Sequence, residues 1–250
     1  IDNNSFERGR VREALPEVFV PEWPDDPFRY RQKLLSLRCF DTATLTDEDR
    51  ERASMYVAQR KRSSVKDDVD SLDEWLDTLD MTVEVESFTD GNRARVVQLL
   101  NKTNQMNLRT RRMSEAEFVD WLDDEERCFR AFRVSDRFGE SGLTGIFSIE
   151  KNGKDAHFKD FILSCRVMGR SVEDVMLAVA TEEARRLGAE TLIAEYLPTE
   201  KNGPCLEFWE ESNFETDGSG HVFQWGLDET YPVPDHIDLV RSDERAHSKA

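Results

Sequence analysis

The stretch from Phe161 to Leu187 constrains the fold of this chain more than any other part of its sequence. It opens with apolar residues that predict a strand, and it ends with apolar side chains at helical spacing, which predict an amphipathic helix. The turn between them has the spacing Arg166-x-x-Gly169-x-Ser171. Glycine lets the backbone approach a ligand closely, and N–H groups at a helix start bind phosphates. The stretch therefore predicts an α/β protein with an anion-binding turn.

Side chains beside this turn carry further predictions. Ser171 is placed to cap the helix, with Asp174 at its third position. Cys165 precedes the turn, where the helix N-terminus and Arg166 would both favour a thiolate. Cys165 is therefore the candidate nucleophile, and the alternative is a small, buried hydrophobic residue at a strand end. The expected phosphate cradle consists of Arg166, Gly169, Arg170 and Ser171. Its alternative is an ordinary capped helix start with arginines in solvent.

Periodicity and turn residues predict the other elements around this stretch. Ser114 opens one helix with a capping box that includes Glu117. Asn152-Gly153 predicts a hairpin, so three consecutive strands form an antiparallel meander. The expected strands are 82–86, 128–134, 142–149, 156–163, 191–196 and 221–227, and the expected helices are 90–105, 114–122, 171–187 and 204–212. The sequence thus predicts a mixed, mostly antiparallel sheet flanked by helices.

We expect four parts in the chain. They are the tail of a preceding domain (1–40), a helical connector (41–80), the main domain (81–232) and a polar tail (233–250). Because the chain begins at Ile1 without a methionine, we expect it to be the C-terminal part of a longer protein.

Short signals place elements in the first two of these parts. The expected elements of the first part are a helix from Phe6 to Leu15, an edge strand at 18–20 and a helix begun by Asp26-Pro27. Thr46 and Ser71 are expected to cap helices of the connector. The basic run 60–62 is expected at a helix C-terminus, where cations favour the helix dipole.

Charge and cysteine content disfavour several classes of function. The formal net charge of −18 argues against nucleic acid as a partner, because phosphate contacts need clustered Lys and Arg. No apolar run approaches the roughly 20 residues of a membrane span, and no signal peptide is expected. The cysteines have no metal-type spacing, so we expect free thiols, no metal site and a reducing, cytoplasmic location.

Two motifs resemble those of the GCN5-related N-acetyltransferase fold. The R-x-x-G-x-S turn resembles that fold's pyrophosphate loop, (Q/R)-x-x-G-x-(G/A), with Ser171 as a departure. Residues 202–214 resemble its late N-x-x-A-x-x-F-Y-x-x-x-G-F signature, with Cys205, Trp209 and Asn213 as departures. The order of predicted elements is also the layout of that fold. The resemblance implies that CoA or a phosphopantetheine arm is the ligand of the turn.

Further blocks are similar to the more specific FkbH-like family. They are Ile1–Arg8, Leu99–Arg112, Ser164–Arg170 and Pro198–Asn202. Such proteins pair an N-terminal haloacid-dehalogenase-like phosphatase domain with a C-terminal acyltransferase-like domain. The resemblance implies that the family takes glyceryl from 1,3-bisphosphoglycerate, dephosphorylates it and loads it on an acyl carrier protein for polyketide assembly.

The family resemblance also implies roles for individual residues. Cys165 would hold the acyl group, and Asn202 would bind the ligand, with no tightly bound cofactor. The phosphatase nucleophile motif D-x-D-x-T is absent from this sequence, and Asn3 stands where a second Asp is expected. Because Mg²⁺ prefers carboxylate ligands, that replacement would weaken its site, and Mg²⁺ is expected only with the phosphatase domain.

The polar block between the first two helices of the main domain would border the acceptor pocket of such a fold. Its amides and cations suit a glyceryl or phosphoglyceryl group, with arginine as a forked ligand. The alternative is a polar loop held by hydrogen bonds from side chains to the backbone. The candidate ligands are Asn101, Asn104, Asn107, Arg111 and Arg112.

Glu195 and His221 are candidate general bases, each near the end of a predicted strand. A carboxylate buried in an apolar strand would have a raised pKa suited to a base. A lone histidine is more often structural.

Three functions therefore stay open. The first is an acyltransferase-like module that moves glyceryl onto a carrier-protein thiol. The second is a non-catalytic module that only docks the carrier protein. The third is an acetyl-CoA-dependent N-acetyltransferase.

Overall fold

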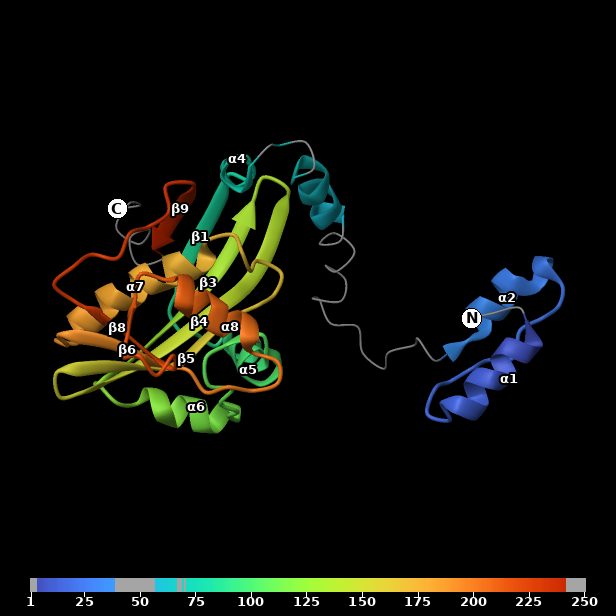
Figure 1. Ribbon diagram of the computed structural model, residues 1–250, viewed down its shortest axis with the longest axis horizontal. Helices are drawn as coiled ribbons and strands as arrows, with labels where there is room; N and C mark the ends of the chain where they lie inside the picture. Colours follow the sequence, from blue (N-terminus) through green and yellow to red (C-terminus); the bar gives the residue numbers. More distant parts are fainter. Residues whose placement is uncertain (1–3, 39–56, 67–68, 70, 242–250) are drawn as a thin grey trace. The chain divides into compact units, whose positions relative to one another are not determined.

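The computed structural model describes residues 4–38, 57–66, 69 and 71–241, which belong to two compact units (Figure 1). The first unit runs from Ile1 to Arg52 and the second from Ala53 to Ala250. Asn3, Cys39 and the helix that Thr46 is predicted to cap lie outside the described residues.

The first unit is helical in its described part. α1 (Ser5–Ala14) is capped by Asn4, whose side chain accepts a hydrogen bond from a backbone N–H at the helix start. Asp26 caps the short η1 (Pro27–Arg29) in the same way, and η1 leads into α2 (Tyr30–Ser36). Both helices predicted here are confirmed, because the capping side chains supply acceptors that the first N–H groups of a helix lack.

The edge strand predicted at 18–20 is wrong. These residues form no strand, and the Val20 carbonyl accepts hydrogen bonds from the Arg12 guanidinium, the shorter at 2.9 Å from Nη2. A side chain of α1 thus takes the backbone acceptor that a neighbouring strand would use. Pro16 and Pro21, on either side, also lack the N–H that a ladder needs.

The second unit is built on a nine-stranded sheet with the order β7-β8-β6-β5-β4-β3-β1-β9, and β2 pairs with β5 (Figure 1). β1 with β9 and β5 with β6 are parallel pairs, and the other pairings are antiparallel. The strands are β1 (Met81–Glu86), β2 (Met106–Asn107), β3 (Arg127–Asp136), β4 (Gly139–Asn152), β5 (Asp155–Leu163), β6 (Thr191–Glu195), β7 (Glu215–Thr216), β8 (Val222–Gly226) and β9 (Ile237–Arg241). The predicted sheet is confirmed.

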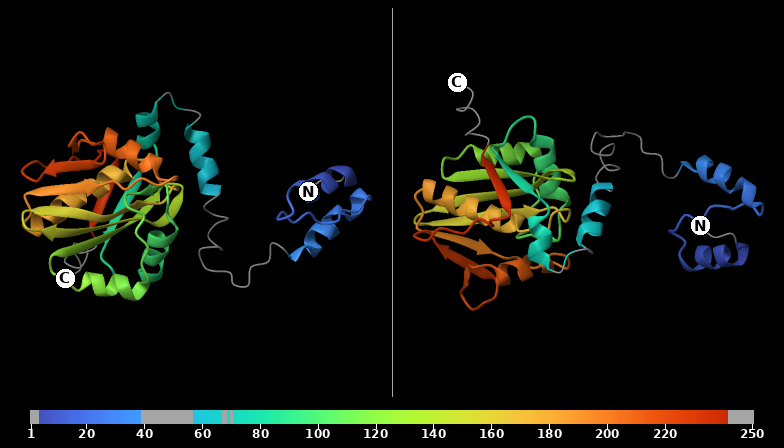
Figure 2. Two further views of the ribbon diagram at one scale, coloured as in Figure 1. Left: turned by 60° about the horizontal axis from the view of Figure 1, so that its bottom comes forward. Right: turned by 90° about the horizontal axis from the view of Figure 1, so that it is seen from above.

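Helices cover both faces of this sheet (Figure 2). Because successive strand residues point to opposite faces, Ile146 of β4 packs with α5 and α6, whereas Phe147 packs in the larger cluster with α4, α7 and α8. The helices are 57–66, α4 (Leu72–Asp77), α5 (Arg93–Lys102), α6 (Glu115–Leu122), α7 (Val172–Arg186) and α8 (Gly203–Glu211). The sheet is therefore the middle layer of the unit.

Local capping signals set two of these helix starts. Ser71 accepts a hydrogen bond from the Glu74 N–H at 3.1 Å. Ser114 and Glu117 form the reciprocal capping box that the sequence predicts, each side chain bonding the other's backbone N–H. Both predictions are confirmed.

The second unit extends past the predicted boundaries of 81 and 232. Trp75 of α4, from the expected connector, is buried in the main core. β9 pairs with β1 over residues 237–241, so part of the expected polar tail is a strand of the sheet. Ile237 is buried and Arg241 bonds to Glu182 of α7, and these two contacts account for the position of β9 at the edge.

Candidate functional site

The turn between β5 and α7 has the left-handed backbone that an anion-binding turn requires, but its cap differs from the prediction. Gly169 has φ +70° and Ser171 has φ +60°. Ser171 occupies the N-cap position, yet its side chain makes no capping hydrogen bond. Capping side chains normally project from extended backbone, whereas the left-handed conformation of Ser171 directs its hydroxyl elsewhere. The predicted capping bond is therefore wrong, although the helix start is right.

A carboxylate of the chain itself occupies the turn. Glu173 Oε1 accepts a hydrogen bond from the Gly169 N–H at 3.0 Å, and the Glu173 side chain is buried. Burial raises the pKa of Glu173 to about 7. The Gly169 N–H, which the sequence analysis expected to bind a phosphate, is thus already bonded within the protein.

Arg170 does not point toward a ligand at this turn. It is buried, and its Nη2 donates to the Arg166 carbonyl at 2.8 Å and to Gln59 Oε1 at 3.2 Å. Its Nη1 lies 3.5 Å from Asp136 Oδ2. Burial lowers the pKa of Arg170, and the neighbouring Arg62 adds to this effect. Arg170 thus fastens the helix 57–66 to the start of α7, and its ligand role stays a prediction.

Arg62 shares the carboxylate that Arg170 contacts. Its Nε lies 2.6 Å and its Nη2 2.9 Å from the two oxygens of Asp136, a forked pair with both side chains almost fully buried. The basic run 60–62 was expected at a helix C-terminus, but the helix continues to residue 66 and Arg62 forms an internal ion pair.

The three cysteines that the structure describes differ in their exposure to solvent. Cys165 is exposed on the turn, whereas Cys128 is half-buried and Cys205 is buried. Burial raises the pKa of Cys128 to about 12 and that of Cys205 to about 12. Thiolate is the reactive form of cysteine, and Cys165 is the most exposed of these three thiols.

Arg111 and Arg112 of the polar block are held by the protein. Arg111 bonds to the buried carboxylate of Asp160, and its guanidinium lies 5.0 Å from the centre of the Trp121 ring. Arg112 donates to the Leu100 carbonyl at 2.5 Å, at the end of α5, and also bonds the side chain of Asn104.

The amides of the block also bond to backbone. Asn101 Nδ2 donates to the carbonyls of Val97 and Met113, at 2.9 and 2.7 Å. Asn107 Nδ2 donates to the Thr103 carbonyl at 2.9 Å, and Asn107 Oδ1 accepts from two N–H groups of the following turn. The alternative given for this block, a loop held by its own hydrogen bonds, is the one that the contacts support.

The segment 106–108 closes the gap between β5 and β6. These two strands pair only through 155–157 with 191–193. Farther along, β2 pairs with the end of β5, the Leu108 N–H donates to the Phe161 carbonyl at 3.1 Å, and the Leu197 N–H donates to the Leu108 carbonyl at 3.0 Å. Backbone of the chain therefore fills the space where the parallel strands separate.

Asn202 locks this segment in place. It is fully buried, and its Oδ1 accepts from the Tyr196 hydroxyl at 2.8 Å and the Thr199 N–H at 2.7 Å. Its Nδ2 donates to the carbonyls of Asn107 and Leu197, at 3.0 and 2.9 Å. Both the oxygen and the nitrogen of the amide are hydrogen-bonded within the protein, so these contacts give Asn202 a structural role, and its ligand role stays a prediction.

The two candidate bases lie outside the interior. Glu195 is half-exposed, and its Oε2 is 3.3 Å from an Arg109 guanidinium nitrogen, so it is not the buried carboxylate that the apolar strand predicts. His221 is exposed and stacks on Tyr196, with 5.8 Å between ring centres. The Tyr196 N–H bonds the His221 carbonyl at 2.7 Å, which makes this residue part of the strand pairing.

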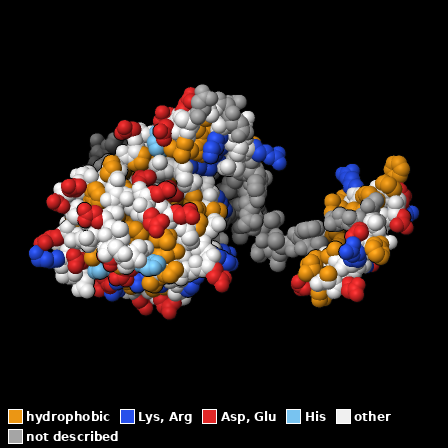
Figure 3. All heavy atoms as spheres, viewed as in Figure 1, with side chains coloured by type: hydrophobic (Ala, Val, Ile, Leu, Met, Phe, Trp, Pro, Cys, Tyr) orange, Lys and Arg blue, Asp and Glu red, His pale blue; other side chains and the backbone are white. Residues whose placement is uncertain are grey.

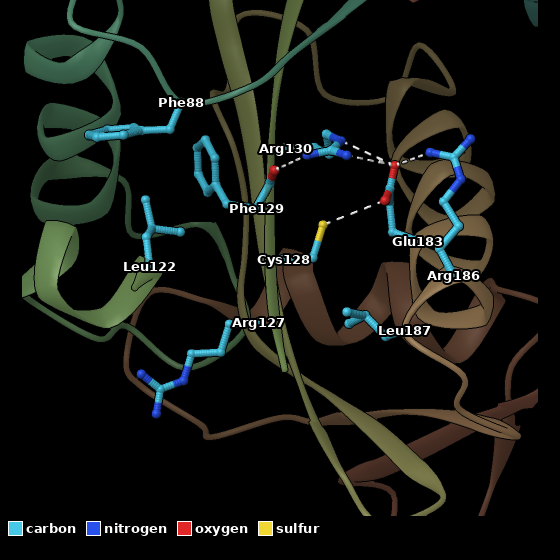
Figure 4. Close-up of a pocket in the computed structure, with 9 residues that line it drawn as sticks. All are labelled: Phe88, Leu122, Arg127, Cys128, Phe129, Arg130, Glu183, Arg186 and Leu187. Carbon is cyan, nitrogen blue, oxygen red and sulfur yellow. Dashed lines mark hydrogen bonds and ion pairs between the residues drawn. The ribbon is translucent and has the colours of Figure 1, made fainter. Parts of the chain in front are cut away.

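One hollow was not anticipated from the sequence. It has a volume of about 340 Å³ and lies where β3 begins, beside the C-terminal end of α7 (Figure 4). The run Arg127-Cys128-Phe129-Arg130 could have indicated this hollow, because it places cations and an aromatic ring on neighbouring positions of one strand.

The described residues bear on three expectations from the sequence, which concern surface charge, metal sites and membrane spans. Figure 3 shows acidic side chains spread over the drawn face of the second unit, as the net charge of −18 leads us to expect. Among the residues that the structure describes, no group of three or more His, Cys, Asp or Glu could hold a metal ion.

None of the helices in the described part of the chain is long and apolar enough to cross a membrane.

Comparison with known proteins gives a likeness of fold. No protein-family model matches the chain, and no curated protein matches it. The ribosomal-protein-S18-alanine N-acetyltransferase of Escherichia coli is 11% identical, over 58% of this chain and 94% of that one, with a TM-score of 0.42. A spermidine N-acetyltransferase from Vibrio cholerae, in complex with CoA and spermine, is 15% identical over 58% and 96%, with a TM-score of 0.44. The PaiA N-acetyltransferase from Thermoplasma acidophilum, in complex with coenzyme A, is 14% identical over 58% and 98%, with a TM-score of 0.42.

Proposed function

We propose that residues 57–241 form an acyltransferase-like module that holds an acyl group as a thioester on Cys165. The observation that carries this proposal is the exposure of Cys165 on the turn between β5 and α7, whereas Cys128 is half-buried and Cys205 is buried. An exposed thiol can be reached by an acyl donor, and its thiolate is the nucleophilic form.

The chemistry needs two steps. The Cys165 thiolate attacks the carbonyl carbon of an acyl phosphate, the C–O bond to phosphate breaks, and phosphate leaves with the electron pair. The thiolate of a carrier protein's phosphopantetheine arm then attacks the thioester carbonyl, and Cys165 leaves as a thiolate. The acyl group stays at one oxidation level throughout, so no redox partner is needed.

The identity of the acyl group and the carrier rests on the motif resemblance. We propose glyceryl from 1,3-bisphosphoglycerate as the acyl group and an acyl carrier protein of polyketide assembly as the acceptor. Removal of the remaining phosphate, and the Mg²⁺ it needs, belong to a phosphatase-like domain of the same protein. Arg166, half-buried beside the exposed thiol, would face the phosphate of the carrier's arm in place of Arg170.

A second candidate function is a module that docks the carrier protein without chemistry. Two observations favour it: Glu173 already bonds the N–H at Gly169, and segment 106–108 fills the gap between β5 and β6. In both places, backbone groups that a ligand could bond are already bonded within the chain.

Intact-protein mass spectrometry separates these candidates. The chain is incubated with 1,3-bisphosphoglycerate or with acetyl-CoA, each with carrier protein, and both proteins are weighed. We expect a thioester-sized mass gain, removable by hydroxylamine, on the wild type and on the control Cys205→Ala, and none on Cys165→Ala. A full mass gain on Cys165→Ala would overturn the thioester proposal. Carrier binding without any mass gain would favour docking.

A further inference from the structure

Strand β3 continues beyond its neighbour β1. The pairing of β1 with β3 ends at Glu86 opposite Ala131, whereas β3 begins four positions earlier, at Arg127. Over 127–130 the strand pairs with β4 on one side. On the other side, no strand among the described residues pairs with it.

The hollow of about 340 Å³ lies along this open edge and reaches both faces of the sheet. Figure 4 shows Phe129 pointing toward Phe88 and Leu122, while Cys128 and Arg130 point the other way, toward Glu183 of α7. A strand placed beside β3 would send its own side chains alternately to these two faces. One face would receive apolar side chains and the other would receive polar ones.

The polar face carries a surplus of positive charge. Arg130 Nη2 and Arg186 Nη1 lie 3.0 and 2.7 Å from the same oxygen of Glu183, which is buried. Two guanidinium groups thus share one carboxylate, and the Arg186 side chain is 61% exposed. On a chain of net charge −18, such a cationic position favours an acidic side chain of a partner.

The edge is covered by one of its own side chains. Arg130 Nη1 donates to the Phe129 carbonyl at 2.8 Å, a backbone group that an added strand would otherwise bond. Charged side chains over an open edge prevent unselective pairing with other chains. An acidic side chain of a partner can bond Arg130 instead. The Phe129 carbonyl is then free to accept a hydrogen bond from the partner's backbone.

We propose that the edge 127–130 binds, as an added strand, an extended segment of a partner protein in which apolar and acidic side chains alternate. Backbone hydrogen bonds give such complexes their affinity, and the two lined faces give them selectivity. The site is separate from Cys165, and neither proposal depends on the other.

The test uses short peptides and the whole chain. A fluorescent peptide of alternating Glu and Val is titrated against the wild type, with a Lys-and-Val peptide as the charge control. Two further Glu-and-Val peptides carry backbone N-methyl groups, one on the N–H groups that face β3 and one on those that face away. We expect the first methylated peptide to lose binding and the second to keep it.

Charge-reversal variants test whether Arg186 contributes to peptide binding. Arg186→Glu should weaken binding of the Glu-and-Val peptide by roughly tenfold or more, and Lys201→Glu, an exposed charge reversal elsewhere, should leave it unchanged. Equal affinity for the Lys-and-Val peptide, or equal loss with both methylated peptides, overturns the proposal. So does a wild-type dimer that Arg186→Glu dissociates, because the occupant is then a second copy. Peptide binding that requires removal of residues 242–250 overturns it as well, because the chain's own end is then the occupant.

Discussion

The side chain of Glu173 reaches back to the N–H of Gly169, 3.0 Å away, across the first turn of α7. Burial raises the pKa of Glu173 from 4.5 to about 7. The folded chain therefore keeps a proton on Glu173 at pH values where the unfolded chain has lost it. Between these two pKa values the free energy of unfolding falls as the pH rises, and above the folded pKa this contribution levels off.

Replacing Glu173 by glutamine should remove that pH dependence, because glutamine does not ionise. In urea unfolding at about pH 5 and about pH 8, the change in unfolding free energy should be smaller in Glu173→Gln than in the wild type, by on the order of a few kcal/mol. Glu211→Gln, an exposed position, is the control and should behave as the wild type. Identical pH dependence in all three proteins would contradict the burial of a proton at this turn.

Loss of Arg62 should destabilise the second unit. Arg62→Met leaves the buried carboxylate of Asp136 with Arg170 alone, and breaking a buried pair on one side costs roughly 3 kcal/mol. Chemical denaturation followed by tryptophan fluorescence measures the change. Arg60→Met, exposed on the same helix, should change the free energy of unfolding by less than about 0.5 kcal/mol. Equal effects of the two substitutions would show that the pair with Asp136 is not formed.

Among the three cysteines that the structure describes, Cys165 should react first when the folded protein is alkylated. Iodoacetamide at neutral pH, followed by peptide mass mapping, should modify Cys165 well before Cys128 and Cys205, whose raised pKa values and burial leave little accessible thiolate. The same experiment in urea should modify all three at similar rates. Early modification of Cys205 in the folded chain would rule out its place in the core.

Asn202→Ala should lower stability rather than ligand affinity alone. The substitution removes the partners of the Tyr196 hydroxyl and of the Asn107 carbonyl inside the core, and each buried group left unpaired costs about 1–3 kcal/mol. Thermal unfolding measures the effect, with Glu210→Ala, exposed on α8, as the control. An unchanged melting temperature for Asn202→Ala, together with weaker carrier binding, would return this residue to the ligand site.

Elements whose cause is local could be predicted from the sequence. The capping box of Ser114 and Glu117 and the cap at Ser71 depend on atoms three residues apart, so the sequence contains the whole interaction. The meander around Asn152-Gly153 follows in the same way from a turn signal between alternating strands.

Roles that depend on distant partners could not be predicted. Arg170 is an exposed cation by sequence, and only the fold brings Asp136 and Gln59 to it. The Asn202 amide could bind a ligand, but its partners are Asn107, in the segment that fills the β5–β6 gap, and Leu197, which follows β6. A polar residue in a motif can thus bond to other parts of the chain or to a ligand. The motif alone does not show which of these two roles it has.

The pairing of β9 with β1 has a consequence for how the protein is made. Met81 meets Ile237, so the sheet gains its last strand only when nearly all of the second unit has left the ribosome. Until then the outer backbone of β1 is open, in a growing polypeptide whose other strands have already been synthesised. An unpaired strand edge can pair unselectively with other chains, so the arrival of β9 protects the backbone of β1.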